Sequence, residues 1–281
     1  MAKNRMRDGE VVTRVGAAAV SPPEAGTVEA WAFDYITARS LSHKLSPPPL
    51  PERWEAAPID RDLVAPARPP ELRPAHRGLE VPADLSSPGA RAKVLHAFFH
   101  HELQAAELMC WALLRFSSAE PAFRKGLLRI CQDEIRHMNA YREHIERLGS
   151  RIGDFAVRDW FWKRVPLCAS KLEFVALMGM GLEAANLEHA PFFGERLAAA
   201  GDEVARDLQD MIAREEVGHV RFAVHWFETW TRGQSFEAWC AALPKPLSPL
   251  LMRGKHFNRE ARLRAGMREE FISALERWQL R

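Results

Sequence analysis

The stretch that decides the fold reads "QDEIRH" and occupies residues 132–137. Its glutamate and histidine, Glu134 and His137, are three residues apart, so in an α-helix they project from one face. That face is otherwise apolar, because it also carries Leu127, Ile130, Cys131, Met138 and Tyr141. A buried carboxylate without a partner is very costly, so a glutamate at such a position must pair, protonate or bind a cation.

The same pattern occurs a second time. "REEVGH" at 214–219 places Glu216 three residues before His219. Upstream of each copy, a segment with helical spacing carries two acids five residues apart, "ELQAAEL" in the first half and "LEAANLE" in the second; these acids are Glu102, Glu107, Glu183 and Glu188. The chain therefore contains an internal repeat, and each half carries one set of candidate metal ligands in the same order.

The repeat predicts a buried metal centre made of one acid from each of two helices and a Glu-x-x-His pair from each of two others; these are Glu102, Glu134, His137, Glu183, Glu216 and His219. Without a cation, four converging carboxylates would repel one another strongly. Carboxylate oxygens with one imidazole per ion suit iron or manganese, whereas structural zinc sites usually contain thiolates. We therefore expect two iron ions, with a Mn/Fe pair as the alternative.

Each pair of acids five residues apart offers two candidates for a single ligand position. Glu102 and Glu183 are preferred, because they share the apolar stripes that carry Phe98, Met109, Met180 and Leu187. The reverse assignment stays open. Glu107 and Glu188 are then expected either behind the ligands or as partners between helices.

Further polar residues flank the predicted ligands. Asp133 and Glu215 each precede a Glu-x-x-His motif and could accept a hydrogen bond from a ligand imidazole, which metal-bound histidines usually need. The alternative for both is a salt bridge to a neighbouring arginine. Tyr141 lies one turn after His137 and could reach the metals, although core packing suits its stripe better. We expect His101, beside the ligand stripe, at the surface.

Helical spacing extends over most of the chain beyond residue 90. It predicts helices at 90–115, 120–148, 168–199, 202–231 and 258–278, with Asp202 as an N-cap and Gly149 as a C-cap. Alternating apolar and polar runs bounded by turn residues do not appear, so strands are not expected. Four long helices with a long crossover between the second and third indicate an all-α, ferritin-like four-helix bundle.

Residues 1–90 differ from the rest, because prolines crowd "SPPPLPERWEAAP" and "APARPPELRP" and interrupt regular structure. One island at 27–45 has helical spacing, with Thr27 as its N-cap. We divide the chain into a Pro-rich N-terminal arm with one helix at 1–90, the bundle at 91–232 and a C-terminal extension with a helix at 233–281. The alternative for the arm is a disordered tail.

Composition narrows the functional classes. The hydrophobic fraction of 47% over 281 residues is enough for a large core. A net charge of +2 makes nucleic acid an unlikely partner, and no apolar run is long enough for a membrane span. The N-terminal apolar run is too short for a secretory signal. The four cysteines form no CxxC pair and suit buried thiols in a reducing compartment, so we expect a cytoplasmic protein.

Several stretches resemble a known family. "HAFFHHELQAAEL", "LEAANLEHAP", "EEVGHVRFAVHWF" and "RGKHFNREARLRAG" are similar to the DUF455 family of bacterial ferritin-like proteins, which is distantly similar to the tRNA-hydroxylating MiaE type. The resemblance covers nearly the whole chain. It implies a four-helix bundle with a di-metal centre at the six ligand positions named above.

We expect an oxygen-dependent di-iron oxidoreductase that uses dioxygen or peroxide, an electron donor and an unknown small substrate, with a homodimer kept open. The alternatives are an iron-oxidising or peroxide-scavenging ferritin-like protein and a non-catalytic helical binding protein with a structural metal site. Access to the metals distinguishes these classes. A pocket along Met109, Gly179, Gly181 and Phe222 would favour an enzyme, and a sealed site would favour a structural metal.

Overall fold

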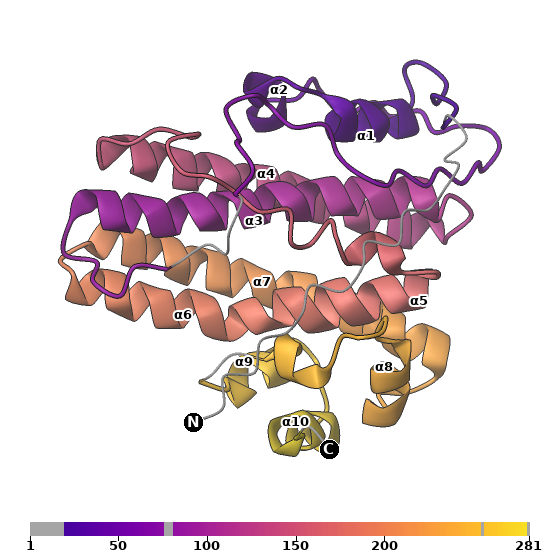
Figure 1. The fold of residues 1–281 in the computed structure, drawn as a ribbon. Helices are drawn as coiled ribbons and strands as arrows, with labels where there is room; N and C mark the ends of the chain where they lie inside the picture. Colours follow the sequence, from indigo (N-terminus) through magenta and orange to yellow (C-terminus); the bar gives the residue numbers. More distant parts are fainter. Residues whose placement is uncertain (1–19, 76–80, 254–255, 280–281) are drawn as a thin grey trace.

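The computed structural model describes residues 20–75, 81–253 and 256–279. Four long helices make up the bundle: α3 (Pro88–Arg115), α4 (Pro121–Arg147), α6 (Ala184–Ala199) and α7 (Glu203–Thr231). Within each half a short turn joins the two helices, so α3 packs mainly on α4 and α6 on α7 (Figure 1). Among the described residues there is no β-strand, only an isolated bridge between Pro74 and Val157. The predicted all-α bundle is confirmed.

Two of the long helices, α3 and α7, begin where the chain supplies a capping side chain. The Ser87 hydroxyl accepts a hydrogen bond from the Ala90 amide, and proline at the first position of α3 needs no amide partner. Asp202 caps α7 by accepting from the Ala205 amide at 3.0 Å, as predicted. Gly149 follows α4 with a φ of +81°, a conformation that favours glycine at a helix end.

The first helix of the second half is not a regular α-helix. It begins as α5 (Lys171–Phe174), continues as a π-helical segment, η2 (Val175–Glu183), and only then becomes α6. The single helix predicted at 168–199 therefore starts later and changes its winding midway. π-helical turns are frequently found at functional sites, and this segment ends on a predicted metal ligand, Glu183.

Two glycines allow the π-helical segment to pack closely. A Cβ atom on Gly179 would lie 2.2 Å from the Ala223 Cβ on α7. A Cβ on Gly181 would lie 2.5 Å from the Met252 sulfur of the C-terminal extension. Both distances are far below van der Waals contact, so these glycines permit close helix contact and do not open a channel.

The N-terminal arm covers one side of the first hairpin. Its helices α1 (Val28–Thr37) and α2 (Leu41–Leu45) pack on α3 and α4 (Figure 1). Thr27 caps α1, as predicted. The single helix expected at 27–45 is instead two, because Ala38 is extended and the Ser40 side chain starts a new turn by accepting from the His43 amide.

The C-terminal extension covers the opposite side, next to α6 and α7 (Figure 1). It contains α8 (Phe236–Ala242), which was not predicted, then α9 (Arg259–Arg264) and α10 (Glu269–Arg277). The single helix predicted at 258–278 is broken at Gly266, whose φ of +87° cannot continue a helix.

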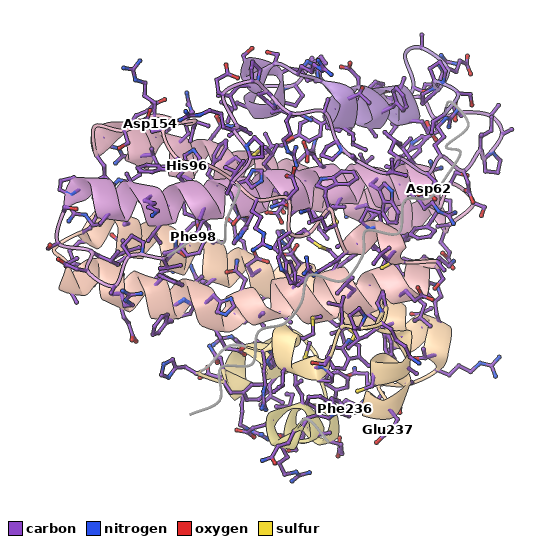
Figure 2. All side chains as sticks on the ribbon, in the orientation of Figure 1. Asp62, His96, Phe98, Asp154, Phe236 and Glu237 are labelled. Carbon is purple, nitrogen blue, oxygen red and sulfur yellow. The ribbon has the colours of Figure 1, made fainter. Side chains whose placement is uncertain are left out.

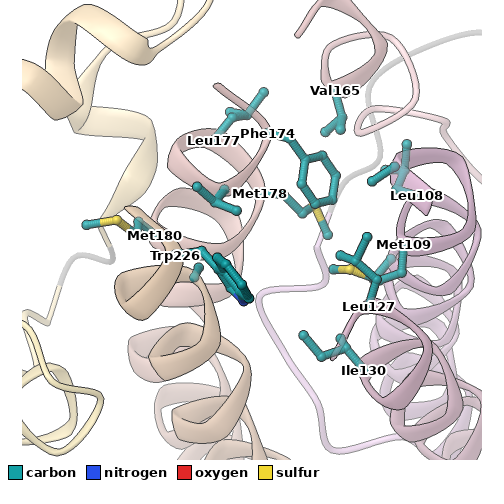
Figure 3. Packing of buried hydrophobic residues seen from close by; sticks show 14 of the residues in the cluster. Leu108, Met109, Leu127, Ile130, Val165, Phe174, Leu177, Met178, Met180 and Trp226 are labelled. Carbon is teal, nitrogen blue, oxygen red and sulfur yellow. The ribbon is translucent and has the colours of Figure 1, made fainter. Parts of the chain in front are cut away.

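The apolar core fills the bundle around the predicted metal site. Figure 3 shows side chains from both hairpins and the crossover meeting in one cluster, among them Leu108, Met109, Leu127, Ile130, Phe174, Met178 and Trp226. Burying each such side chain stabilises the fold by about 1.5–3 kcal/mol. Three of the four cysteines are buried free thiols, and Cys240 is half-buried.

No helix within the described ranges has both the length and the apolar composition that crossing a bilayer requires. The N-terminal stretch whose apolar run is too short for a secretory signal lies at 1–19, outside the described residues.

Candidate metal centre

The structure brings the six predicted ligands together from four segments: Glu102 from α3, Glu134 and His137 from α4, Glu183 from the end of η2, and Glu216 and His219 from α7. All six are buried. Their ligand atoms form two overlapping sets, each with all atoms within 4.8 Å of one another. Glu102 and His137 belong to one set, Glu183 and His219 to the other, and Glu134 and Glu216 to both. Two neighbouring ions that share two carboxylates fit this arrangement.

Both imidazoles turn Nδ1 toward the carboxylates. His137 Nδ1 lies 3.4 Å from oxygens of both Glu102 and Glu134. His219 Nδ1 lies 3.0 Å from Glu134 Oε1 and 3.3 Å from Glu216 Oε2. The two Glu-x-x-His motifs therefore point at a common centre, as their helical spacing predicts.

The outer imidazole nitrogens face carboxylates on the other hairpin. His137 Nε2 lies 2.7 Å from Glu215 on α7, and His219 Nε2 lies 3.3 Å from Asp133 on α4. Arg136 donates to both acids, at 2.5 Å to Asp133 and 2.7 Å to Glu215. The two roles considered for these acids, imidazole acceptor and arginine partner, thus occur together.

The inward-facing atoms have no hydrogen-bond partner within the described structure. These buried atoms are Nδ1 of His137 and of His219, both oxygens of Glu134, and one oxygen each of Glu183 and Glu216. Buried polar atoms in proteins almost always have a partner, so unpartnered atoms converging on one place need an explanation. A pair of cations supplies it, and the carboxylate and imidazole donors suit such ions. The cluster can therefore hold metal.

The charges of the cluster fit the same conclusion. Burial, reinforced by neighbouring carboxylates, raises the pKa of Glu102 and of Glu183 well above the usual value. Burial disfavours the His137 cation, but the nearby Glu102 and Glu134 carboxylates outweigh it and raise the His137 pKa to about 12. The pKa of His219 is also raised, against its burial, by the Glu134 charge. Protons thus hold the cluster together without metal, and metal binding would release them.

The second acid of each pair does not join the ligand sets. Glu107 accepts from three groups, Lys44 Nζ at 2.8 Å, Arg68 Nη1 at 2.5 Å and Trp162 Nε1 at 2.8 Å. Glu188 forms a two-bond ion pair with Arg262, at 2.8 and 3.0 Å. Of the two roles expected for these acids, the structure gives them that of partners between elements. Glu107 holds the N-terminal arm, and Glu188 holds the C-terminal extension.

Tyr141 lies beside the cluster in the core. Its hydroxyl is hydrogen-bonded to the Gln209 amide at 3.0 Å, and its ring packs against Phe98. Burial, with the nearby Glu102 charge, raises its pKa well above the usual value. Of the two roles considered, core packing describes its contacts.

Two side-chain amides near the cluster were not predicted from the sequence. Asn186 Nδ2 donates to Glu216 Oε1 at 3.0 Å, and Gln209 is completely buried. Helical spacing could have indicated both, because Asn186 lies three residues after Glu183 and Gln209 lies seven residues before Glu216.

A pocket of about 210 Å³ opens onto Glu102 and Glu183, which form its inner end. Phe98 on α3, labelled in Figure 2, lines it together with crossover residues that include Phe161. His101 stacks on Phe161 with ring centroids 5.1 Å apart and lines this pocket, so this histidine is half-buried, whereas a surface position was expected.

The route along the π-helical segment, which was considered as a test between an enzyme and a structural metal site, is almost closed. A cavity of about 10 Å³ remains beside Met109, Gly179 and Phe222. Gly181 does not line it, because this glycine packs against Met252. The opening that would have favoured an enzyme is therefore absent along this route, whereas a larger pocket reaches the ligand cluster from another side.

The molecule is thus an all-α bundle with a buried glutamate and histidine cluster that can hold metal. A family model described as "Protein of unknown function (DUF455)" matches residues 27–273, so the chain belongs to the DUF455 family, as its resemblance indicated. An uncharacterised protein of Haemophilus influenzae is 32% identical over 155 residues, covering 52% of this chain and 54% of that protein. The chain thus spans about half the length of this curated relative. No solved structure matches significantly.

Proposed function

We propose that this chain binds two iron ions and acts as an oxygen-dependent oxidoreductase on a small substrate. The observation that carries the proposal is the pair of overlapping ligand sets that share Glu134 and Glu216. Iron in both positions suits the oxygen-rich donors, and a Mn/Fe pair is the alternative with the same donor set. Bound ferrous ions would supply the electrons that reduce dioxygen or peroxide while a substrate or an electron donor is oxidised.

The protein side chains would prepare the cluster for metal. Glu215 and Asp133 accept from Nε2 of His137 and His219, which keeps the proton on that nitrogen and frees Nδ1 for an ion. Asn186 donates to one oxygen of Glu216 and thereby orients the other oxygen inward. Both imidazoles and the shared carboxylate of Glu216 are thus held before metal arrives.

The accessible pocket favours an enzyme over a structural metal site. It reaches Glu102 and Glu183, one acid from each ligand set, and its walls are mainly apolar. An apolar wall excludes water and strengthens electrostatic interactions next to the reacting group. A site that only braced the bundle would need no such opening. Free thiols at all four cysteines support the cytoplasm as the proposed location.

The test is metal content, measured by elemental analysis of full-length protein expressed with iron and manganese supplements. We expect about two ions per chain, mainly iron. Anaerobic loading of the metal-free protein with ferrous iron, followed by air, should then change the near-ultraviolet absorption. Absence of metal, or a single zinc ion without an optical change, would overturn the proposal.

A further inference from the structure

The pocket beside the ligand cluster carries an inference about the substrate, which rests on the proposed function. The pocket lies between α3 and α6, with Trp160 and Phe161 of the crossover in its wall. Glu102 and Glu183 are the only two of the six ligands that line it. A substrate group that enters the pocket would therefore contact the cluster at Glu102 and Glu183.

The wall of the pocket offers little to a charged group. Apart from the two ligand glutamates it is lined by Phe98, His101, Ala105, Trp160, Phe161, Leu182, Ala185, Asn186 and His189. No lysine, arginine or aspartate is among these described lining residues. A charged group without a partner is costly to bury, so the wall selects against charge.

The aromatic residues of the wall present both ring faces and ring edges. Phe161 stacks with His101 at an interplanar angle of 24° and meets Trp160 edge-on, at 75°. Phe98 meets Phe193 edge-on at a centroid distance of 5.0 Å. Offset-stacked and edge-to-face contacts are the geometries that aromatic pairs prefer, so a further ring is favoured in this wall.

The size of the pocket limits what enters. At about 210 Å³ it exceeds the engineered apolar cavity of about 150 Å³ that binds benzene. It is smaller than the roughly 300–1,000 Å³ of pockets that enclose a whole drug-sized ligand. We infer that the substrate places an uncharged, single aromatic ring against the metal cluster, while the rest of the substrate stays outside, near the exposed His189.

The test compares two ring compounds of one size on the full-length protein after treatment with a chelator, so that a carboxylate cannot gain affinity by binding metal. Benzyl alcohol and benzoate are titrated while the indole N–H resonances are followed by NMR. The Trp160 resonance is assigned as the one lost in Trp160→Phe. Benzyl alcohol should shift it saturably, and benzoate should bind at least about tenfold more weakly. Equal affinity for the two compounds, or no shift with either, overturns the inference.

Two substitutions test whether benzyl alcohol binds in this pocket. Ala185→Leu adds bulk to the wall and should abolish the benzyl alcohol shift, whereas Ala199→Leu makes the same change at an exposed position of α6 and should leave it intact. If Ala185→Leu does not fold, Leu182→Ala serves instead, because the enlarged pocket should admit 2-naphthylmethanol, which the wild-type pocket should refuse. Binding unaffected by these changes overturns the inference.

Metal content, measured on the same preparations before chelation, separates the two proposals. About two metal ions per chain without ring binding would refute this inference alone. Ring binding by a protein that never takes up metal would refute the proposed function and leave the apolar pocket as a binding site.

Discussion

Two kinds of buried glutamate lie five residues apart on the same two segments of the bundle. Glu102 and Glu183 face the ligand cluster, where no lysine or arginine meets them in the described structure. Glu107 and Glu188 point the other way and meet Lys44, Arg68 and Arg262. All four acids are buried, so burial does not distinguish them. The charges of the neighbouring side chains distinguish the two kinds of acid.

The pKa values make the difference visible. Burial raises the pKa of Glu102, and the Glu134 charge adds to that rise. Burial acts on Glu107 in the same direction, but the Arg68 and Lys44 charges outweigh it and lower the Glu107 pKa. Each half of the repeat thus places one acid in the ligand cluster and uses the other to fasten a terminal segment over the bundle.

The largest effect is expected from the ligand cluster. Glu134→Ala should lose both metal ions, because Glu134 belongs to both sets, whereas Glu102→Ala should lose about one. His219→Ala should likewise remove at least one. The bundle should stay folded in all three variants. Elemental analysis together with far-ultraviolet circular dichroism tests this, and full metal occupancy in both Glu134→Ala and His219→Ala would show that the ligand assignment is wrong.

The fastening acids should instead control stability. Glu188→Gln leaves the fully buried Arg262 without its carboxylate, which should lower the free energy of unfolding by about 3–5 kcal/mol, as measured by urea denaturation of metal-free protein. Glu188→Leu combined with Arg262→Met removes both charges and should recover most of that loss. Glu183→Gln is the matched control and should have little effect without metal. Equal losses for Glu183→Gln and Glu188→Gln would remove the distinction between the two kinds of acid.

The crossed contacts behind the imidazoles predict a smaller, site-selective effect. Asp133→Asn should weaken metal binding about 10–100-fold at the set that contains His219, because that imidazole loses its outer acceptor. The set that contains His137 should be unaffected, since Glu215 serves it. Chelator competition in His137→Ala and His219→Ala backgrounds isolates one set each. A loss only in the His219→Ala background would mean that the pairing is not crossed.

The smallest effect concerns pH. The raised pKa of His137, about 12, means that its stabilising protonation is complete below the unfolded value near 6.5 and is lost as pH rises toward 12. Between pH 7 and 8.5 the metal-free protein should lose about 1 kcal/mol per pH unit for each such histidine. Metal affinity should rise over the same range, because the protons that metal displaces are released more favourably as the proton concentration falls. Thermal unfolding with and without metal should show the two midpoints moving apart as pH increases.

The raised pKa values of His219, Glu102 and Glu183 act in the same direction as that of His137, because each group also keeps its proton in the folded state above its unfolded pKa. The pKa of His96, lowered by burial to about 4, contributes its pH dependence below about 6.5, since both folded and unfolded forms are neutral above that value. The lowered pKa of Glu107 likewise acts in the acid range, where stability is lost as pH falls. A metal-free midpoint that stays constant from pH 7 to 8.5 would contradict the raised pKa of His137.

Local periodicity explains how much of the site could be predicted. The i, i+3 spacing within each Glu-x-x-His motif defines a helix face whatever surrounds it, so the convergence of these residues follows from two helices burying their apolar stripes. The winding of η2 carries no comparable signal, because a helix that switches to i+5 bonds keeps the same apolar composition. The breaks at Ala38 and Gly266 were missed because each interrupts an otherwise continuous apolar pattern.

The repeat, its ligand residue types and the all-helical class can therefore be read from the amino-acid order alone, since they depend on spacings within single helices. The role of Glu107 as a fastening acid depends on Lys44 and Arg68, which reach α3 from the N-terminal arm. The crossed partners Asp133 and Glu215, and the pocket wall at Phe161, likewise bring together segments from different parts of the chain. Only tertiary packing decides such contacts, because the distance between two side chains on different elements is set by how those elements dock.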